Sequence, residues 1–247
     1  MKRGLHIFQV FFLLVFLLAC SKSQHEIDFP CLTYSEPVYH IKEIVETKGT
    51  ELWKSTYYYD SLNRLQRRCD SGAYYQTVIW KYTLDKVLLL RQDSTIIYFL
   101  NIDSNEYAIT PSTGHYLWEY NSEGYLVKQT ESWTELGTQI RNYEYGCWNN
   151  VKISSGGYDT QGNPIGGGIT TNEFYNDKIN TIGNENIGIK YWGKQNNCLT
   201  KCITSTYKER IDTLALHSYE FDSLNRVIKE IEKKPMKEDI IRYYKYY

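Results

Sequence analysis

The sequence predicts an all-β fold, in which an antiparallel meander of hairpins forms a strongly twisted or partly closed, barrel-like sheet. The first observation is a turn signal, DSLNR, which stands at 60–64 and again at 222–226, each time between an aromatic and an aliphatic residue. The second is that aromatic residues ahead of the turns come in pairs two positions apart, the period at which side chains share one face of a strand. We therefore expect about 12 to 16 strands, joined mainly as hairpins.

Looser copies of the turn signal recur along the chain. Aligned on the preceding aromatic residue, the units are Tyr59-DSLNR-Leu65, Tyr120-NSEGY-Leu126, Tyr145-GCWNN-Val151, Trp192-GKQNN-Cys198 and Phe221-DSLNR-Val227. The fourth place after the aromatic residue is always Asn or Gly: Asn63, Gly124, Asn149, Asn196 and Asn225. Because Asn and Gly adopt positive φ most readily, this column predicts the left-handed position of each turn. Three turns begin with Asp60, Asn121 and Asp222, whose side-chain oxygens can accept backbone N–H groups.

Other connections differ in length. Residues 82–87 predict a hairpin of intermediate length, and residues 175–179 predict a two-residue turn. The stretch 154–172 contains six glycines and a proline, which predicts a long loop or irregular crossover.

The N-terminus predicts an export signal. Lys2 and Arg3 precede the apolar run Ile7–Ala19, which is too short to span a bilayer comfortably as a helix. The run ends in LLAC and resembles the lipobox of bacterial lipoproteins, which implies cleavage after residue 19 and acylation of Cys20, palmitate included. We expect a lipidated tether at 20–36 and a single β-rich domain at 37–247, anchored to the bacterial outer membrane.

Charge and cysteine content exclude other classes. Removing Lys2 and Arg3 takes the formal net charge from −1 to −3, and no basic patch remains that would favour nucleic acid. The later cysteines are odd in number and scattered, which is not a disulfide framework: Cys31, Cys69, Cys147, Cys198 and Cys202. On an extended strand, residues 198 and 202 are about 13 Å apart, too far to bridge.

No motif predicts catalysis, a metal site or a cofactor. The mature histidines, His25, His40, His115 and His217, stand apart in sequence, and the chain has no HExxH, CxxC or GxSxG motif. Pairs of carboxylates on neighbouring strands arise by chance among 29 acids. We therefore expect a protein that is not an enzyme.

The repeats carry two resemblances. The Tyr-Asp turn units resemble the YD repeats of Rhs-type bacterial surface proteins. Together with the Cys20 motif, the C-terminal run from Tyr191, with its Gly-Lys-x-Asn-Asn turn and final alternating aromatic strand, resembles a Bacteroidetes lipoprotein family of unknown function with a porin-like fold. The resemblance spans about residues 40–247 and implies fold and location; its motifs are structural, so it implies no catalytic residue.

The aromatic columns are the candidate for function. We expect a curved face that stacks on a glycan or another flat envelope ligand, formed by Trp80, Tyr82, Trp118, Tyr120, Tyr143 and Tyr145. Plain sheet packing is the alternative for each pair.

Further alternatives concern the whole protein: a carrier or chaperone for a lipid or lipoprotein, or a scaffold that pairs with another envelope protein through a strand edge. A transmembrane barrel is disfavoured because several candidate strands are short for a bilayer.

These classes predict different structures. A glycan binder should expose several tryptophans on one concave face, out of Trp80, Trp118, Trp133, Trp148 and Trp192. A lipid carrier should have a cavity lined by aliphatic residues, an enzyme should bring polar groups together in one pocket, and a scaffold should show neither feature.

Overall fold

The computed structural model describes residues 39–247 apart from 73–74, 134, 148, 197 and 208–209. The described residues belong to one compact unit. The predicted signal peptide, Cys20 and the tether to residue 36 lie outside the described residues.

The described residues form a 17-stranded antiparallel sheet. The strands are β1 (Ile41–Lys48), β2 (Glu51–Tyr59), β3 (Leu65–Gly72), β4 (Gln76–Tyr82), β5 (Lys86–Arg91), β6 (Ile96–Ile102), β7 (Ala108–Pro111), β8 (Tyr116–Tyr120), β9 (Leu126–Trp133), β10 (Gly137–Gly146), β11 (Asn149–Tyr158), β12 (Pro164–Ile165), β13 (Ile169–Ile179), β14 (Cys198–Tyr207), β15 (Arg210–Phe221), β16 (Val227–Lys233) and β17 (Ile240–Tyr246). Two short helical turns, α2 (Asn184–Ile187) and η1 (Lys190–Trp192), lie between β13 and β14.

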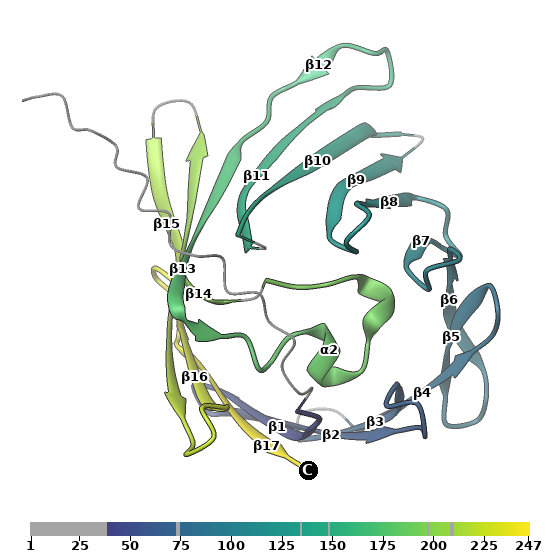
Figure 1. The fold of residues 1–247 in the computed structure, drawn as a ribbon. Helices are drawn as coiled ribbons and strands as arrows, with labels where there is room; N and C mark the ends of the chain where they lie inside the picture. The colour runs from purple at the N-terminus through teal and green to yellow at the C-terminus, as the bar shows by residue number, and fades with distance from the viewer. Residues whose placement is uncertain (1–38, 73–74, 134, 148, 197, 208–209) are drawn as a thin grey trace, which may run out of the picture. The chain divides into compact units, whose positions relative to one another are not determined.

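The sheet closes on itself as a barrel with one unsealed seam (Figure 1). Most strands pair with their neighbours in sequence, β11 pairs with both β12 and β13, and the last strand, β17, pairs with β1. Between β7 and β8, the described residues form no ladder. The predicted all-β, partly closed sheet is thus confirmed.

Two local predictions were wrong. The glycine-rich stretch 154–172 is largely strand, because β11 continues to Tyr158 and β13 starts at Ile169, with a tight turn at 159–163. Residues 175–179 are not a hairpin turn: they continue β13, whose register against β14 is irregular between Phe174 and Ile179.

The DSLNR turns are two identical hydrogen-bonded units. Asp60 Oδ1 accepts the backbone N–H groups of Leu62 and Arg64, and its Oδ2 accepts from the Arg64 side chain. Asp222 makes the same three interactions with Leu224 and Arg226. The same pair of backbone bonds recurs at three further turns, which begin at Asp103, Asn121 and Asp159.

The left-handed column was right for three of its five members. Asn63, Gly124 and Asn225 have φ values of 61°, 89° and 57°. Asn149 instead begins β11, because Cys147, with φ 48°, takes the left-handed position of that turn. Asn196 is not in a hairpin turn at all, since its segment runs inside the barrel.

Tyrosine hydroxyls link each hairpin to the strand before it. Five of them donate to backbone carbonyls on the preceding strand at 2.5 to 3.0 Å, in the pairs Tyr59–Ile41, Tyr82–Leu65, Tyr145–Leu126, Tyr219–Thr200 and Tyr246–Val227. Tyr120 ends β8 as Tyr82 ends β4, yet its hydroxyl is buried without a hydrogen-bond partner. This tyrosine stands at the seam, where β8 forms no ladder with the preceding strand, β7.

A chain segment occupies the inside of the barrel. Residues 180–196, which include α2 and η1 and are called here the inner segment, cross the ring of strands (Figure 1). Backbone groups beside the turns bind it: Leu65 N–H donates to Gly188 O at 2.9 Å, and Lys194 N–H donates to Gly124 O at 2.8 Å. Val227 N–H donates to Thr181 Oγ1 at 2.9 Å. The repeated turns therefore also position the inner segment.

Candidate functional site

Four of the six candidate aromatic residues are used to pack the inner segment. Trp80 and Trp118 are only 7% and 9% exposed. Trp80 Nε1 donates to the Tyr191 hydroxyl at 2.8 Å, and Trp118 meets the Trp192 ring edge-on at 4.9 Å. Tyr82 and Tyr120 belong to the same packed set. For these residues, the structure shows packing, the alternative that the sequence left open.

The described residues do not show the row of exposed tryptophans on one concave face that would indicate a glycan-binding sheet. Trp80, Trp118 and Trp192 pack in or against the core, and Trp133 stacks on His115 at 4.2 Å on the margin of the sheet. Trp148 lies outside the described residues. A ligand cannot reach Trp80 and Trp118, because the inner segment already covers them.

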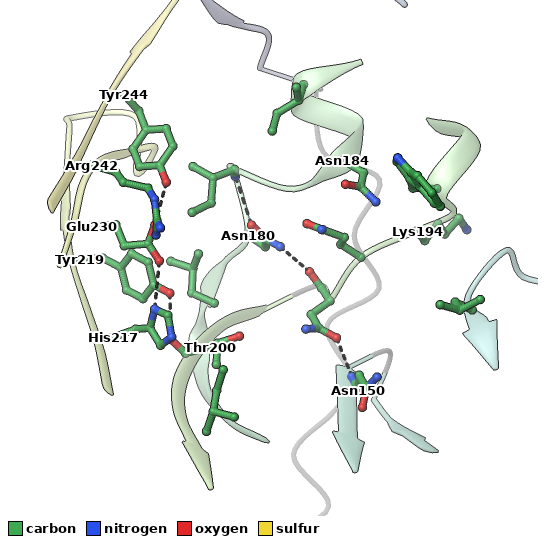
Figure 2. Close-up of a pocket in the computed structure, with 18 of the residues that line it drawn as sticks. Asn150, Asn180, Asn184, Lys194, Thr200, His217, Tyr219, Glu230, Arg242 and Tyr244 are labelled. Carbon is green, nitrogen blue, oxygen red and sulfur yellow. Dashed lines mark hydrogen bonds and ion pairs between the residues drawn. The ribbon is translucent and has the colours of Figure 1, made fainter. Parts of the chain in front are cut away.

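The remaining candidates, Tyr143 and Tyr145, line a cavity of about 580 Å³ between the inner segment and the barrel wall. Its wall residues are Ile44, Leu126, Asn150, Leu199, Thr200, Ile203, His217, Tyr219, Glu230, Arg242 and Tyr244, and its inner-segment residues are Asn180, Ile182, Asn184, Ile187, Trp192, Lys194, Gln195 and Asn196. Figure 2 shows the two sides facing each other across the space.

The wall side carries an ionic network. His217 Nδ1 lies 3.0 Å from Glu230 Oε1, and the Tyr244 hydroxyl and Arg242 donate to Glu230 Oε2 at 2.7 and 3.2 Å. Arg242 also pairs with Glu46 and Glu232. Burial alone would raise the pKa of Glu230, but the hydrogen bonds from His217 and Tyr244 and the charge of Arg242 hold it below its usual value. Glu230 is therefore an ionised acceptor, and the proton of the shared bond belongs to His217 Nδ1.

The opposite side is built from amides held by the backbone. Asn180 Nδ2 donates to Asn196 O at 3.0 Å, and Asn184 Nδ2 donates to Gly193 O at 3.2 Å. Asn196 Oδ1 accepts the backbone N–H of Asn150 at 2.6 Å. These bonds fix the rim of the cavity where the inner segment meets β11.

Two buried polar atoms of the lining residues have no hydrogen-bond partner: His217 Nε2 and Asn150 Oδ1. The His217 side chain is 10% exposed and the Asn150 residue 8%. A buried polar atom without a partner costs about 1 to 3 kcal/mol, and functional sites are one place where such atoms persist. Both atoms belong to residues that line the cavity.

The sequence reasoning missed His217, Glu230, Arg242 and the amides. A signal for His217 existed, because it stands two residues before Tyr219 and four before Phe221 and so shares their face of the strand. Nothing comparable pointed to Asn150, whose neighbour Asn196 is 46 residues away.

The metal-ligand and cysteine predictions can also be compared with the structure. In the described part of the chain, no group of three or more His, Cys, Asp or Glu side chains is arranged to hold a metal ion. Cys198 and Cys202 are free thiols on one strand, as expected, and Cys69 is also free. Cys147, however, is disulfide-bonded, which the scattered spacing did not predict.

No protein-family model matches the chain, and no curated protein matches it. Solved structures share its fold, among them two porin-like proteins. One is a porin-like protein from Bacteroides uniformis, with a TM-score of 0.60, 15% identity and coverage of 85% of this chain and 99% of that one.

The other is a porin-like protein from Bacteroides vulgatus, with a TM-score of 0.58, 10% identity and the same coverage of both chains. The fold is porin-like. At these identities the porin-like likeness extends to the fold alone, which agrees with the fold that the sequence resemblance implied. The YD-repeat and lipoprotein resemblances stay predictions.

Proposed function

We propose that this porin-like protein is a non-catalytic binding protein of the cell envelope that holds a small polar ligand inside its barrel. The observation that carries the proposal is the cavity of about 580 Å³ with two unpartnered buried polar atoms, His217 Nε2 and Asn150 Oδ1. Its volume lies within the range of about 300 to 1,000 Å³ that is usual for small-molecule sites. The proposed ligand site is thus the cavity beside the inner segment, and not the aromatic face that this segment covers.

Polar groups also converge in enzyme active sites, so the number of carboxylates in the cavity is used to distinguish binding from hydrolysis. Glycoside hydrolysis generally needs two carboxylates about 5 to 9 Å apart. Among the described residues that line the cavity, Glu230 is the one carboxylate, and both of its oxygens already accept hydrogen bonds. This arrangement favours binding over hydrolysis.

The lining disfavours the lipid carrier. Six aliphatic side chains line the cavity, but Asn180, Lys194 and Arg242 stand among them, and an acyl chain would desolvate these polar groups without giving a hydrogen bond in return. The scaffold would use the seam, but β7 and β8 have only four and five residues and β7 ends in Pro111, features that protect an edge from pairing.

The location belongs to the same proposal. The outer face carries a repeated pair of a glutamate before a turn and a lysine after it, such as Glu119–Lys128 and Glu220–Lys229, at 2.7 and 2.6 Å. Such charges suit water better than lipid. No helix of the described residues is long and apolar enough to cross a membrane. We infer that acylation at Cys20 holds the protein at the envelope.

Replacing Cys20 tests the anchor. C20A should move the protein from the membrane to the soluble fraction and abolish labelling by a palmitate analogue, with C69A as the matched control that leaves both unchanged. Membrane association of C20A would contradict the lipid anchor.

Native mass spectrometry of the full-length protein, purified in detergent from its own host, tests the binding function. A small polar molecule that is present in the wild type and lost in N150A supports it. A bound acyl lipid would favour the carrier, a bound polypeptide would favour the scaffold, and a hydrolysed product would contradict the non-catalytic role.

A further inference from the structure

The two unpartnered atoms in the cavity restrict the chemistry of its ligand. This inference rests on the proposed function, because it takes the cavity as the binding site. Asn150 is held in place by its backbone, whose N–H donates to Asn196 Oδ1 and whose carbonyl accepts from Asn172 Nδ2 at 2.8 Å. Its Oδ1 can only accept a hydrogen bond. The ligand must therefore present a hydrogen-bond donor to Asn150 Oδ1. The oxygens of a carboxylate or phosphate would be repelled by the lone pairs of this amide oxygen.

His217 sets the second requirement. Its Nδ1–H donates to the Glu230 carboxylate at 3.0 Å, which fixes the ring. Nε2 of the neutral ring accepts a hydrogen bond, whereas Nε2 of the charged ring donates one. A hydroxyl group can both donate and accept, so it satisfies Nε2 in either protonation state, whereas an ammonium group suits only the neutral ring and a carboxylate only the charged one.

The charges around His217 are already balanced within the wall. Arg242 is shared among Glu46, Glu230 and Glu232, all within 3.2 Å. The remaining cation of the lining, Lys194, is exposed, and its Nζ lies 5.7 Å from the centre of the Tyr125 ring. The cavity therefore offers no buried charge for an ionic ligand to neutralise.

Aromatic rings form part of the cavity lining, beside several aliphatic side chains. Tyr143, Tyr145, Tyr219 and Trp192 line the same cavity. Burial raises the pKa of Tyr145 to about 12, so its phenol stays protonated at neutral pH. Flat apolar surfaces beside fixed amides fit a ring that carries C–H groups on its faces and hydroxyl groups at its edge.

We propose that the ligand is an uncharged saccharide, with one hydroxyl donating to Asn150 Oδ1 and another bonded to His217 Nε2.

The test is equilibrium binding to the full-length protein in detergent, with maltotriose, cellotriose, mannotriose and N,N′,N″-triacetylchitotriose as neutral probes and trigalacturonic acid and a tripeptide as charged probes. At least one neutral probe should bind, and N150A and H217N should each weaken it by about tenfold or more. The control variants are N142A and H115N, which change an exposed asparagine and a half-buried histidine, both outside the cavity lining, and should leave binding unchanged.

Three results would overturn the proposal in distinguishable ways. Binding of only a charged probe, weakened by N150A and H217N, contradicts the saccharide and keeps the cavity as a binding site. Binding of a neutral probe that neither variant weakens places the sugar elsewhere. Binding of no probe at millimolar concentration contradicts both the saccharide and the proposed function. Because N150A and H217N are tested separately, misfolding of one variant leaves the other to decide.

Discussion

Individual tyrosine hydroxyls contribute to the stability of this barrel. Five tyrosine hydroxyls reach a carbonyl on the preceding strand, whereas the Tyr120 hydroxyl is buried with no partner beside the seam. Removing one partner of a buried hydrogen bond costs about 1 kcal/mol, whereas removing an unsatisfied donor costs little or stabilises. The same substitution should thus have opposite effects at equivalent positions.

Replacing tyrosine by phenylalanine tests this difference. Y145F should lower the free energy of unfolding by about 1 kcal/mol, because it leaves the Leu126 carbonyl without its donor. Y120F should leave stability unchanged or raise it. Urea denaturation of both variants, compared at equal slope, provides the measurement. Equal losses in the two variants would contradict the pattern.

The turn carboxylates predict a dependence on pH. Burial by itself raises the pKa of Asp60 and Asp222, but the backbone and side-chain bonds from Arg64 and Arg226 outweigh it, so both lie below the usual value. A carboxyl whose pKa is lower in the folded state stabilises the fold above its unfolded pKa of about 3.9. That contribution is lost as the pH falls below about 4.

A double variant isolates the contribution of these two residues. D60N/D222N keeps the side-chain oxygens that accept backbone N–H groups, as Asn121 does in its own turn. Its unfolding free energy should fall less than that of the wild type between pH 5 and pH 3, as measured by urea denaturation at each pH. Parallel curves for the two proteins would show that the turns carry no such linkage.

At the scale of elements, the inner segment depends on close approach to the turns. Gly188 has a φ of 75°, and a Cβ there would lie 2.7 Å from Leu65 N. Gly162, in the turn at 159–163, has a similar φ of 84° but nothing within 4 Å of its Cβ position. Both glycines therefore need a positive φ, but only Gly188 lacks room for a Cβ atom.

Alanine at each position separates backbone conformation from packing. Both G162A and G188A should lose about 1 to 2 kcal/mol from the left-handed backbone. G188A should lose a further 1 kcal/mol or more, roughly, because the inner segment has to move away from β3. Thermal and urea unfolding of the pair provide the comparison, and equal losses would show that the segment adapts freely.

Sequence reasoning worked where the physics is local. The turn chemistry of Asp60 and Asn63 acts over four residues, so a repeated pattern predicted it correctly, and the paired aromatic residues predicted strands with one shared face. Asn196 was predicted wrongly because GKQNN resembles the turn units in sequence, whereas the backbone N–H of Lys194 donates to Gly124 O in a hairpin about 70 residues earlier. The cavity could not be predicted for the same reason, because Asn150, His217 and Arg242 are far apart in sequence and line one cavity only in the folded barrel.

At the scale of the whole molecule, closure follows from both ends of the chain. β17 pairs with β16 and with β1, and Arg242 on β17 binds both Glu46 and Glu230. The last strand therefore joins the two ends of the chain and also forms one wall of the cavity. The seam between β7 and β8 lies elsewhere in the ring, so the ligand site does not depend on it.

The most direct test is a crystal structure of the full-length protein with a neutral oligosaccharide that binds it in solution. We expect the sugar in the cavity between the inner segment and the wall, with ring hydroxyls within hydrogen-bond distance of Asn150 Oδ1 and His217 Nε2 (Figure 2). A sugar bound on the outer face of the sheet, with the cavity empty, would contradict it.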